Sequence, residues 1–187
     1  MRHLPALLLV LAATSGAACA RHAYGPDGLA LFPPGSTGRT YFEKCNFVEI
    51  ENGGSWFCDM SHDYKVVERA KPSTHDEEIQ AFVARESGRL GKYAGKQSTK
   101  LEGKLSGLEF STLGFELQQD DPKHPETKGL APFPWVVFFG TETLPDGAGL
   151  VVSCTIAGSS AGDVGKVAAC HEGMKILRET MHAKHKK

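Results

Sequence analysis

Apolar, aromatic and β-branched residues gather in several short segments of the chain, and such runs between turn residues are typical of β-strands. Two such segments, residues 41–50 and 56–68, flank the short sequence ENGGS at residues 51–55. Asn and Gly adopt positive φ angles at low cost, so Asn-Gly-Gly between two strands indicates a hairpin turn. The first part of the folded chain is therefore predicted to be a β-hairpin.

A helix is predicted after this hairpin. Thr74 and Glu77 form the T-x-x-E pattern of a capping box, in which each side chain accepts a hydrogen bond from the other residue's backbone amide. The residues that then recur at helical spacing are Ile79, Phe82, Val83, Glu86 and Leu90. Since most of them are apolar, one face of this helix is expected to pack on the sheet, and Gly88 and Gly91 end the pattern.

The second half of the chain predicts four further strands and a closing helix. Residues 96–118 contain two strands with a turn or bulge near 104–108, and two apolar strands, 135–139 and 150–157, follow around the turn 144–149. Residues 162–182 have the spacing of a helix. The order ββ-α-ββ-ββ-α predicts an α+β domain, an antiparallel sheet of about six strands with two main helices packed on it and stapled by disulfides.

The first twenty residues have the order of a secretory signal peptide: a basic start, an apolar stretch at residues 4–13, and then small residues. The apolar stretch is about ten residues long, whereas a transmembrane helix needs roughly twenty. Two processing sites are open. Cleavage after Ala20 would remove Cys19, whereas the lipobox-like sequence GAAC would make Cys19 the lipidated first residue. Both predict an exported protein, with membrane contact only through a lipid on Cys19.

The rest of the chain divides into a leader, one domain and a short tail. Residues 21–38 are rich in Gly and Pro and are predicted to form an extended leader or tether. Residues 39–183 are long enough for a single domain with its own core, and residues 184–187 are a basic tail that we expect to be frayed. The formal net charge is −1 at pH 7, which gives no reason to expect a nucleic acid as a partner.

Four cysteines remain after Cys19, and an even number is typical of disulfide bonds in an exported protein. Cys154 lies on the apolar face of a predicted strand and Cys170 on the apolar stripe of the closing helix, so the two are expected to meet. Cys45 and Cys58 lie on the two arms of the first hairpin and form the second predicted bridge. Four cysteines allow three pairings, and the sequence leaves the other two open.

One motif suggests an enzyme. The sequence GSSAG at residues 158–162 matches the G-x-S-x-G nucleophile elbow and lies between a strand and a helix. A hydrolase needs an acid and a histidine after Ser160, but the later histidines, His171, His182 and His185, lie on or beyond the helix that leads away from it. We therefore interpret GSSAG as a turn whose serines cap the helix, and a small serine hydrolase remains the alternative function.

Neither a cofactor nor a metal ion is predicted. His182 and His185 share a helix face, but a metal site needs three or four converging ligands. The segment 119–134 is polar and rich in proline, and loops of this length are often functional. Its candidate recognition residues are Asp120, Asp121, His124, Phe133 and, just after it, Trp135. An exposed aromatic side chain there would anchor a protein partner, whereas core packing is the alternative for Trp135.

The element order over residues 41–182 resembles the PsbP-like superfamily, whose exported bacterial members include small lipoproteins. The similar features are the helix THDEEIQAFVARESGRL, the segment GKLSGLEFSTLGFEL, the hairpin WVVFFGTETLPDGAGLVVSCTIAG and a closing helix. The four cysteines and residues 119–134 depart from that family. The family has no shared catalytic set, so the resemblance implies a non-enzymatic accessory or binding domain and no particular functional residue.

These observations together predict a protein of the bacterial cell envelope that is periplasmic or anchored by a lipid. Its expected partner is another exported or envelope protein, which it would contact as an assembly factor, an inhibitor or an immunity-type protein. The sequence leaves the identity of that partner and the oligomeric state open.

Overall fold

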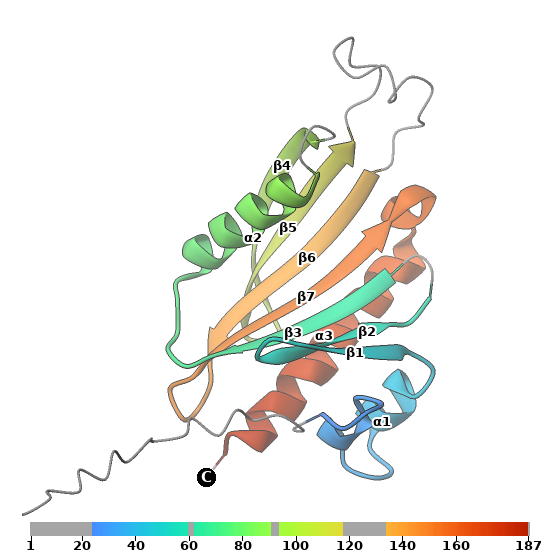
Figure 1. The fold of residues 1–187 in the computed structure, drawn as a ribbon, viewed down its shortest axis with the longest axis vertical. Coiled ribbons are helices and arrows are strands. Elements are labelled where there is room, and N and C mark those ends of the chain that lie inside the picture. The colour runs from blue at the N-terminus through green and yellow to red at the C-terminus, as the bar shows by residue number, and fades with distance from the viewer. Residues whose placement is uncertain (1–23, 60–61, 91–93, 118–133, 187) are drawn as a thin grey trace, which may run out of the picture.

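The computed structural model describes residues 24–59, 62–90, 94–117 and 134–186, which form a seven-stranded sheet with helices on both faces (Figure 1). The strand order is β1-β2-β3-β7-β6-β5-β4, and all neighbouring strands are antiparallel. The predicted α+β class is therefore confirmed. The strands are β1 (Asn46–Ile50), β2 (Gly53–Phe57), β3 (His62–Arg69), β4 (Ala94–Leu105), β5 (Leu108–Leu117), β6 (Pro134–Thr143) and β7 (Gly149–Ala157).

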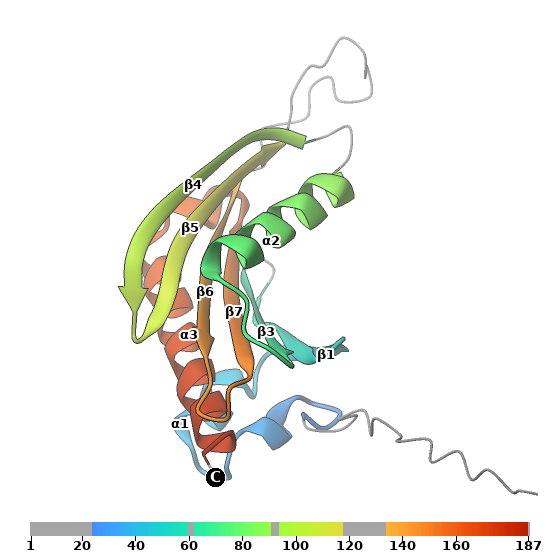
Figure 2. The same ribbon diagram turned by 90° about the vertical axis from the view of Figure 1, so that its left-hand side faces the viewer.

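The two long helices lie on opposite faces of the curved sheet, as the edge view shows (Figure 2). Helix α3 (Val164–Lys184) packs along β7 and β3, whereas α2 (His75–Leu90) contacts β6 on the other face. Three shorter helical segments complete the described chain: η1 (Leu29–Leu31), α1 (Thr37–Phe42) and η4 (Gly158–Gly162). None of the helices in the described ranges is both long enough and apolar enough to cross a membrane.

The sheet has one strand more than the six or so predicted, because the segment 56–68 is divided between β2 and β3. The Asp59 carboxylate accepts a hydrogen bond from the backbone N–H of His62, which favours a turn at this point. The expected first strand also starts later than residue 41. Tyr41 and Phe42 belong to α1, which begins where the Ser36 side chain accepts a hydrogen bond from the Arg39 amide.

The predicted hairpin turns are present. In β1–β2, Ile50 pairs with Gly53, so Glu51 and Asn52 form the turn and Asn52 adopts φ 57°. Gly53 is needed here because a Cβ would overlap the carbonyl oxygen of Val66 on β3. The β4–β5 turn likewise places its two residues, 106 and 107, at positive φ.

The largest core lies between the sheet and α3. On β7, the predicted inward residues Leu150, Val152, Cys154 and Ile156 are all buried there. The predicted stripe of α3 packs against them through Val167, Cys170, Met174, Leu177 and Met181. Both predicted disulfides, Cys154–Cys170 and Cys45–Cys58, are formed, with Cα–Cα distances of 5.5 and 4.0 Å. The first of them joins the helix covalently to the centre of the sheet.

Helix α2 begins at the predicted capping box. The Thr74 hydroxyl accepts from the Glu77 amide at 3.3 Å, and the Glu77 carboxylate accepts from the Thr74 amide at 2.9 Å. The next residue, His75, is buried, and its ring nitrogens lie 2.7 and 2.8 Å from the hydroxyls of Thr141 and Ser111. These contacts attach the start of α2 to β6 and β5.

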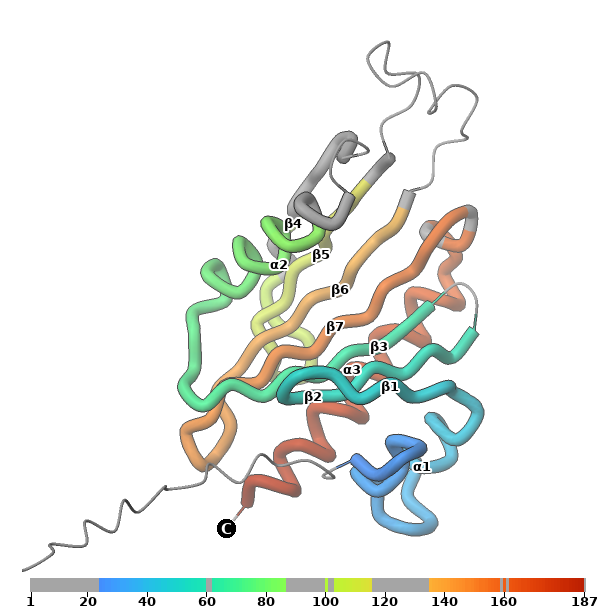
Figure 3. The backbone as a smooth tube through the Cα atoms, viewed as in Figure 1, coloured from blue at the N-terminus to red at the C-terminus, as the bar shows by residue number. Residues whose placement is uncertain are grey.

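The expectation of an extended leader over residues 21–38 is wrong from Tyr24 onward. Tyr24, Leu31 and Phe32 are buried in the main core, and Phe32 stacks on Phe42 at 5.1 Å between ring centroids. Figure 3 shows this segment in blue beside the C-terminal part of α3. Large apolar side chains among the Gly and Pro residues give the segment enough surface to bury, which outweighs the flexible composition.

The two ends of α3 also differ from expectation. The serines of GSSAG do not cap the helix. Asp163 does, because its carboxylate accepts from the amides of Gly165 and Lys166 at 2.8 and 3.1 Å. An ionised side chain is favoured there by the partial positive charge of the helix N-terminus. At the other end, the expected frayed tail is ordered through His185, which pairs with carboxylates of the domain.

Candidate functional site

Half of the sheet is uncovered on the side of α2. Alternation along the strands places one row of side chains from four neighbouring strands on this side: Val48, Ser55, Lys65 and Ser153 are in register across β1, β2, β3 and β7. The row continues into Phe139 of β6, which packs against Phe82 of α2. Helix α2 therefore covers β6, and no helix of the described chain lies over the row beyond it (Figures 1 and 2), although its two small side chains, Ser55 and Ser153, are only 1% and 5% exposed. We call the α2 side of β1, β2, β3 and β7 the open face.

Two large apolar side chains are exposed on the open face. Val48 is 51% exposed and Phe57, in the neighbouring row and paired with Asp63, is 42% exposed. Among the described side chains, one other large hydrophobic residue is exposed, Val164, which is 83% exposed and lies at the start of α3. An exposed apolar patch with a polar rim is a common feature of protein-binding surfaces.

A shallow hollow of about 30 Å³ joins the open face to α2. At its side, the Arg69 guanidinium forms two hydrogen bonds with the buried Glu78 carboxylate, at 3.0 and 3.1 Å. Arg85 lies over the Phe82 ring at 4.9 Å from the centroid and is well exposed, and Lys65 contributes a second partly exposed cation. Lys65 and Arg85 are paired with Asp63 and Glu86, at 3.9 and 3.4 Å, so ion pairs and not unpaired cations border the apolar part of the open face.

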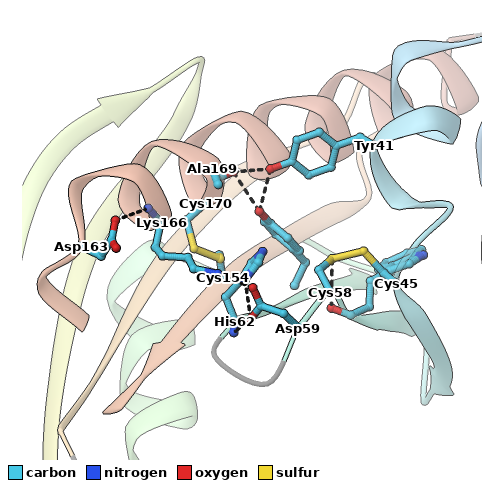
Figure 4. A network of polar contacts seen from close by, with 12 residues as sticks. Tyr41, Cys45, Cys58, Asp59, His62, Cys154, Asp163, Lys166, Ala169 and Cys170 are labelled. Carbon is cyan, nitrogen blue, oxygen red and sulfur yellow. Dashed lines mark hydrogen bonds and ion pairs between the residues drawn. A yellow bond between two sulfur atoms is a disulfide. The ribbon is translucent and has the colours of Figure 1, made fainter. Parts of the chain in front are cut away.

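A polar network supports the edge of the open face from the other side of the sheet (Figure 4). The hydroxyls of Tyr41 and Tyr64 lie 2.9 Å apart, and each is within hydrogen-bonding distance of the Ala169 carbonyl, at 2.7 and 2.8 Å. Burial raises the pKa of both phenols, so they act as neutral donors. Asp59, after β2, forms an ion pair with Lys166 of α3. The short strands β1–β3 are thus held by α1 and α3 as well as by pairing.

A separate groove of about 510 Å³ lies between the N-terminal segment and α3. Most of the residues that line the groove are small or apolar, and its charged residues are Glu179 and Lys184. Gly38 permits the close approach of α1, since a Cβ there would lie 2.5 Å from the Phe32 ring. The groove is lined by Leu31, Pro33, Ser36, Thr37, Gly38, Ile176, Glu179, Thr180, Ala183 and Lys184.

The structure tests only part of the predicted recognition loop. Asp120, Asp121, His124 and Phe133 lie outside the described residues, as does the lipidation candidate Cys19. Trp135 is described, and its proposed role as an exposed anchor is wrong. It is 7% exposed and stacks on Phe115 at 5.7 Å, because its strand faces the core under α2.

The serine hydrolase alternative gains no geometric support. Ser160 lies in η4, where its carbonyl accepts a hydrogen bond from the Asp163 amide at 3.0 Å. The His171 ring packs edge-on against Phe138 at 5.0 Å, and His182 lies about 27 Å further along the α3 axis than Val164. No group of three metal-ligating side chains occurs within the described ranges.

The open face could not be found from the sequence. The β-rich composition of residues 41–50 and 56–68 correctly indicates that Val48 and Phe57 are on strands, but it does not show which face of each strand is covered. That depends on α2 lying over one end of the sheet only, which no local pattern reports.

Comparisons with known proteins give little further information. No family model and no curated protein matches the chain. Among solved structures, the Ran-binding protein Mog1p of Saccharomyces cerevisiae is 12% identical, with a TM-score of 0.36, over 74% of this chain and 84% of that one. The lipid transfer and protein localization domain of human StarD13 is 9% identical, with a TM-score of 0.34, over 73% of this chain and 88% of that domain.

Proposed function

We propose that this chain is an exported binding protein of the bacterial cell envelope, and that its open face docks on another exported protein. The observation that carries the proposal is the exposure of Val48 and Phe57 together on the half of the sheet that α2 leaves bare. Two disulfides support export, because such bonds persist in oxidising compartments and are rare in the cytosol.

The chemistry of the open face defines the kind of partner. Val48 and Phe57 need an apolar strip, and the ion pairs Lys65–Asp63 and Arg85–Glu86 place both charges beside it, which favours polar groups at the rim of the partner's surface. A partner of this kind would contact side chains already held in place by paired strands and a disulfide. Little ordering entropy would then be lost on binding, which favours a specific complex.

In this proposal the protein acts through surface contacts and not through catalysis. Its role would be that of an assembly factor, an inhibitor or an immunity-type protein, in line with the PsbP-like resemblance of its element order. Cys19 precedes the described chain by a few residues, so a lipid there would hold the domain at a membrane surface.

Site-specific photo-crosslinking in the native envelope tests the docking surface. A benzophenone amino acid replaces Phe57 in one variant and, as a matched control, Val164 in another, since both positions are exposed and apolar. We expect a discrete adduct with one envelope protein from position 57, which disappears when Val48→Asp is added. An adduct that forms equally from position 164, or that survives Val48→Asp, would contradict the proposal.

The export part of the proposal has its own test. The intact mass of the protein isolated from its native cells, measured with and without reductant, reports the cleavage site, any lipid and the number of disulfides. We expect loss of the first 18 or 20 residues and a gain of four protons on reduction of the two bridges. A protein that retains Met1, or whose mass is unchanged by reductant, would refute export to an oxidising compartment.

A further inference from the structure

Both ends of the described chain meet at Glu68 of β3. The Tyr24 hydroxyl and the Lys184 ammonium group donate to Glu68 Oε1, at 2.9 and 2.8 Å, and His185 Nε2 lies 2.9 Å from Glu68 Oε2. The other ring nitrogen of His185, Nδ1, lies 2.6 Å from Asp146 Oδ2 in the β6–β7 turn. One imidazole ring therefore joins two carboxylates from different parts of the sheet.

This arrangement requires a particular protonation state. Ionised carboxylates only accept hydrogen bonds, so both ring nitrogens of His185 must donate, and only the imidazolium form has two N–H groups. Burial raises the pKa of Glu68, but hydrogen bonds from Lys184, Tyr24 and His185 outweigh it and leave the pKa below its ordinary value. Hydrogen bonds from His185 and the Ala148 amide lower the pKa of Asp146. Both carboxyl groups are thus ionised near neutral pH.

We propose that His185 is a proton-controlled latch that fastens the end of α3 and, through Glu68, the N-terminal segment at Tyr24. With both protons present the ring holds both carboxylates. Loss of one proton leaves a ring lone pair facing a carboxylate, which removes one hydrogen bond and adds repulsion, so the latch opens. Imidazole is the side chain whose charge ordinarily changes between pH 5 and 8.

The surrounding charges define the limits of the latch. Lys184 and Tyr24 also donate to Glu68, and Glu49 of β1 adds a negative charge near Tyr24. One turn earlier on α3, His182 and Arg178 pair separately with Glu142. Opening should therefore loosen the last turn of α3 and the start of the described chain, while the rest of the helix stays on the sheet. Lys184 lines the groove beside α1, so the latch also borders that groove.

Hydrogen exchange at single amides of the full exported chain tests this device. The informative amides are those of Gly28, Ala30 and Phe32, which are hydrogen-bonded within the N-terminal segment, and that of His185. Protection factors are compared at about pH 6 and about pH 8.5, after correction for intrinsic exchange. We expect protection at these amides to fall roughly tenfold at the higher pH, the effect of one charge-assisted hydrogen bond.

Three variants separate the latch from general loosening. His185→Gln should have low protection at both pH values, because Gln cannot donate to two carboxylates in this way. Asp146→Asn should remove the pH dependence but keep protection high, since an amide can donate to the neutral ring. His182→Gln should keep the wild-type pH dependence of amide protection at Gly28, Ala30 and Phe32. Equal wild-type protection at both pH values, or an undiminished response in Asp146→Asn, would overturn the proposal. Neither outcome bears on docking at the open face.

Discussion

Replacement of the fully buried disulfide should destabilise the protein more than replacement of the partly buried one, although the two bridges close loops of similar length. Cys154 and Cys170 are 16 residues apart and Cys45 and Cys58 are 13 apart, so the chain-entropy estimate gives about 3 kcal/mol for each. The first pair is fully buried between α3 and β7, whereas the second is only partly buried. Double Ala substitution at the buried pair therefore adds voids in the core, which cost a further ~1–2 kcal/mol.

Urea denaturation of the two double variants and the wild type measures this difference. We expect losses in the free energy of unfolding of about 3 kcal/mol for Cys45→Ala with Cys58→Ala, and about 4–5 kcal/mol for Cys154→Ala with Cys170→Ala. The comparison requires similar denaturant slopes, which show that the unfolded states are equally expanded. If removal of Cys154–Cys170 lowers the free energy of unfolding by no more than removal of Cys45–Cys58, the disulfide does not clamp α3 to the sheet as described.

Three further predictions concern the same fold. Burial lowers the pKa of His75, so this side chain binds a proton more tightly in the unfolded chain than in the folded one. The stability of the protein should therefore fall as the pH drops below about 6.5, and thermal melts of His75→Gln should lack this pH dependence. Asp163→Ala removes the cap of α3 and should cost about 1 kcal/mol in urea melts, while Asp163→Asn should cost less; equal losses would contradict a capping role. Gly173→Ala places a Cβ against the Tyr64 ring and should cost roughly 2–3 kcal/mol in urea melts; because ring carbons lie nearer to that Cβ than the hydroxyl does, adding Tyr64→Phe should not recover the loss, and full recovery would contradict the packing described.

The sequence predicts the central part of the fold because its signals there are local and agree with one another. Alternation on β7 and the stripe on α3 identify the two surfaces that meet, and the cysteine on each surface supplies the same pairing independently. The capping box at Thr74 and the turns at Asn52 and Ser106 are likewise set by a few adjacent residues. These locally predicted elements form in the folded protein because the tertiary packing favours the same conformations.

The features that the sequence does not predict depend on distant contacts. Tyr24 and Phe32 lie in a Gly- and Pro-rich segment, and only the presence of Trp56 and Phe42 nearby in space makes their burial favourable. The exposure of Phe57 depends on how far α2 extends across the sheet. His185 looks like part of a charged tail until Glu68 and Asp146, more than thirty residues away in sequence, are brought beside it.

Hydrogen exchange of the complex with the crosslinked partner tests the docking proposal most directly. The chain is compared alone and bound, and protection is read separately for residues 46–69, which carry most of the open face, and for α3 as an internal reference. The proposal predicts new protection in the first region, with α3 unchanged. Protection confined to α3 and the groove beside α1, with residues 46–69 unaffected, would contradict it.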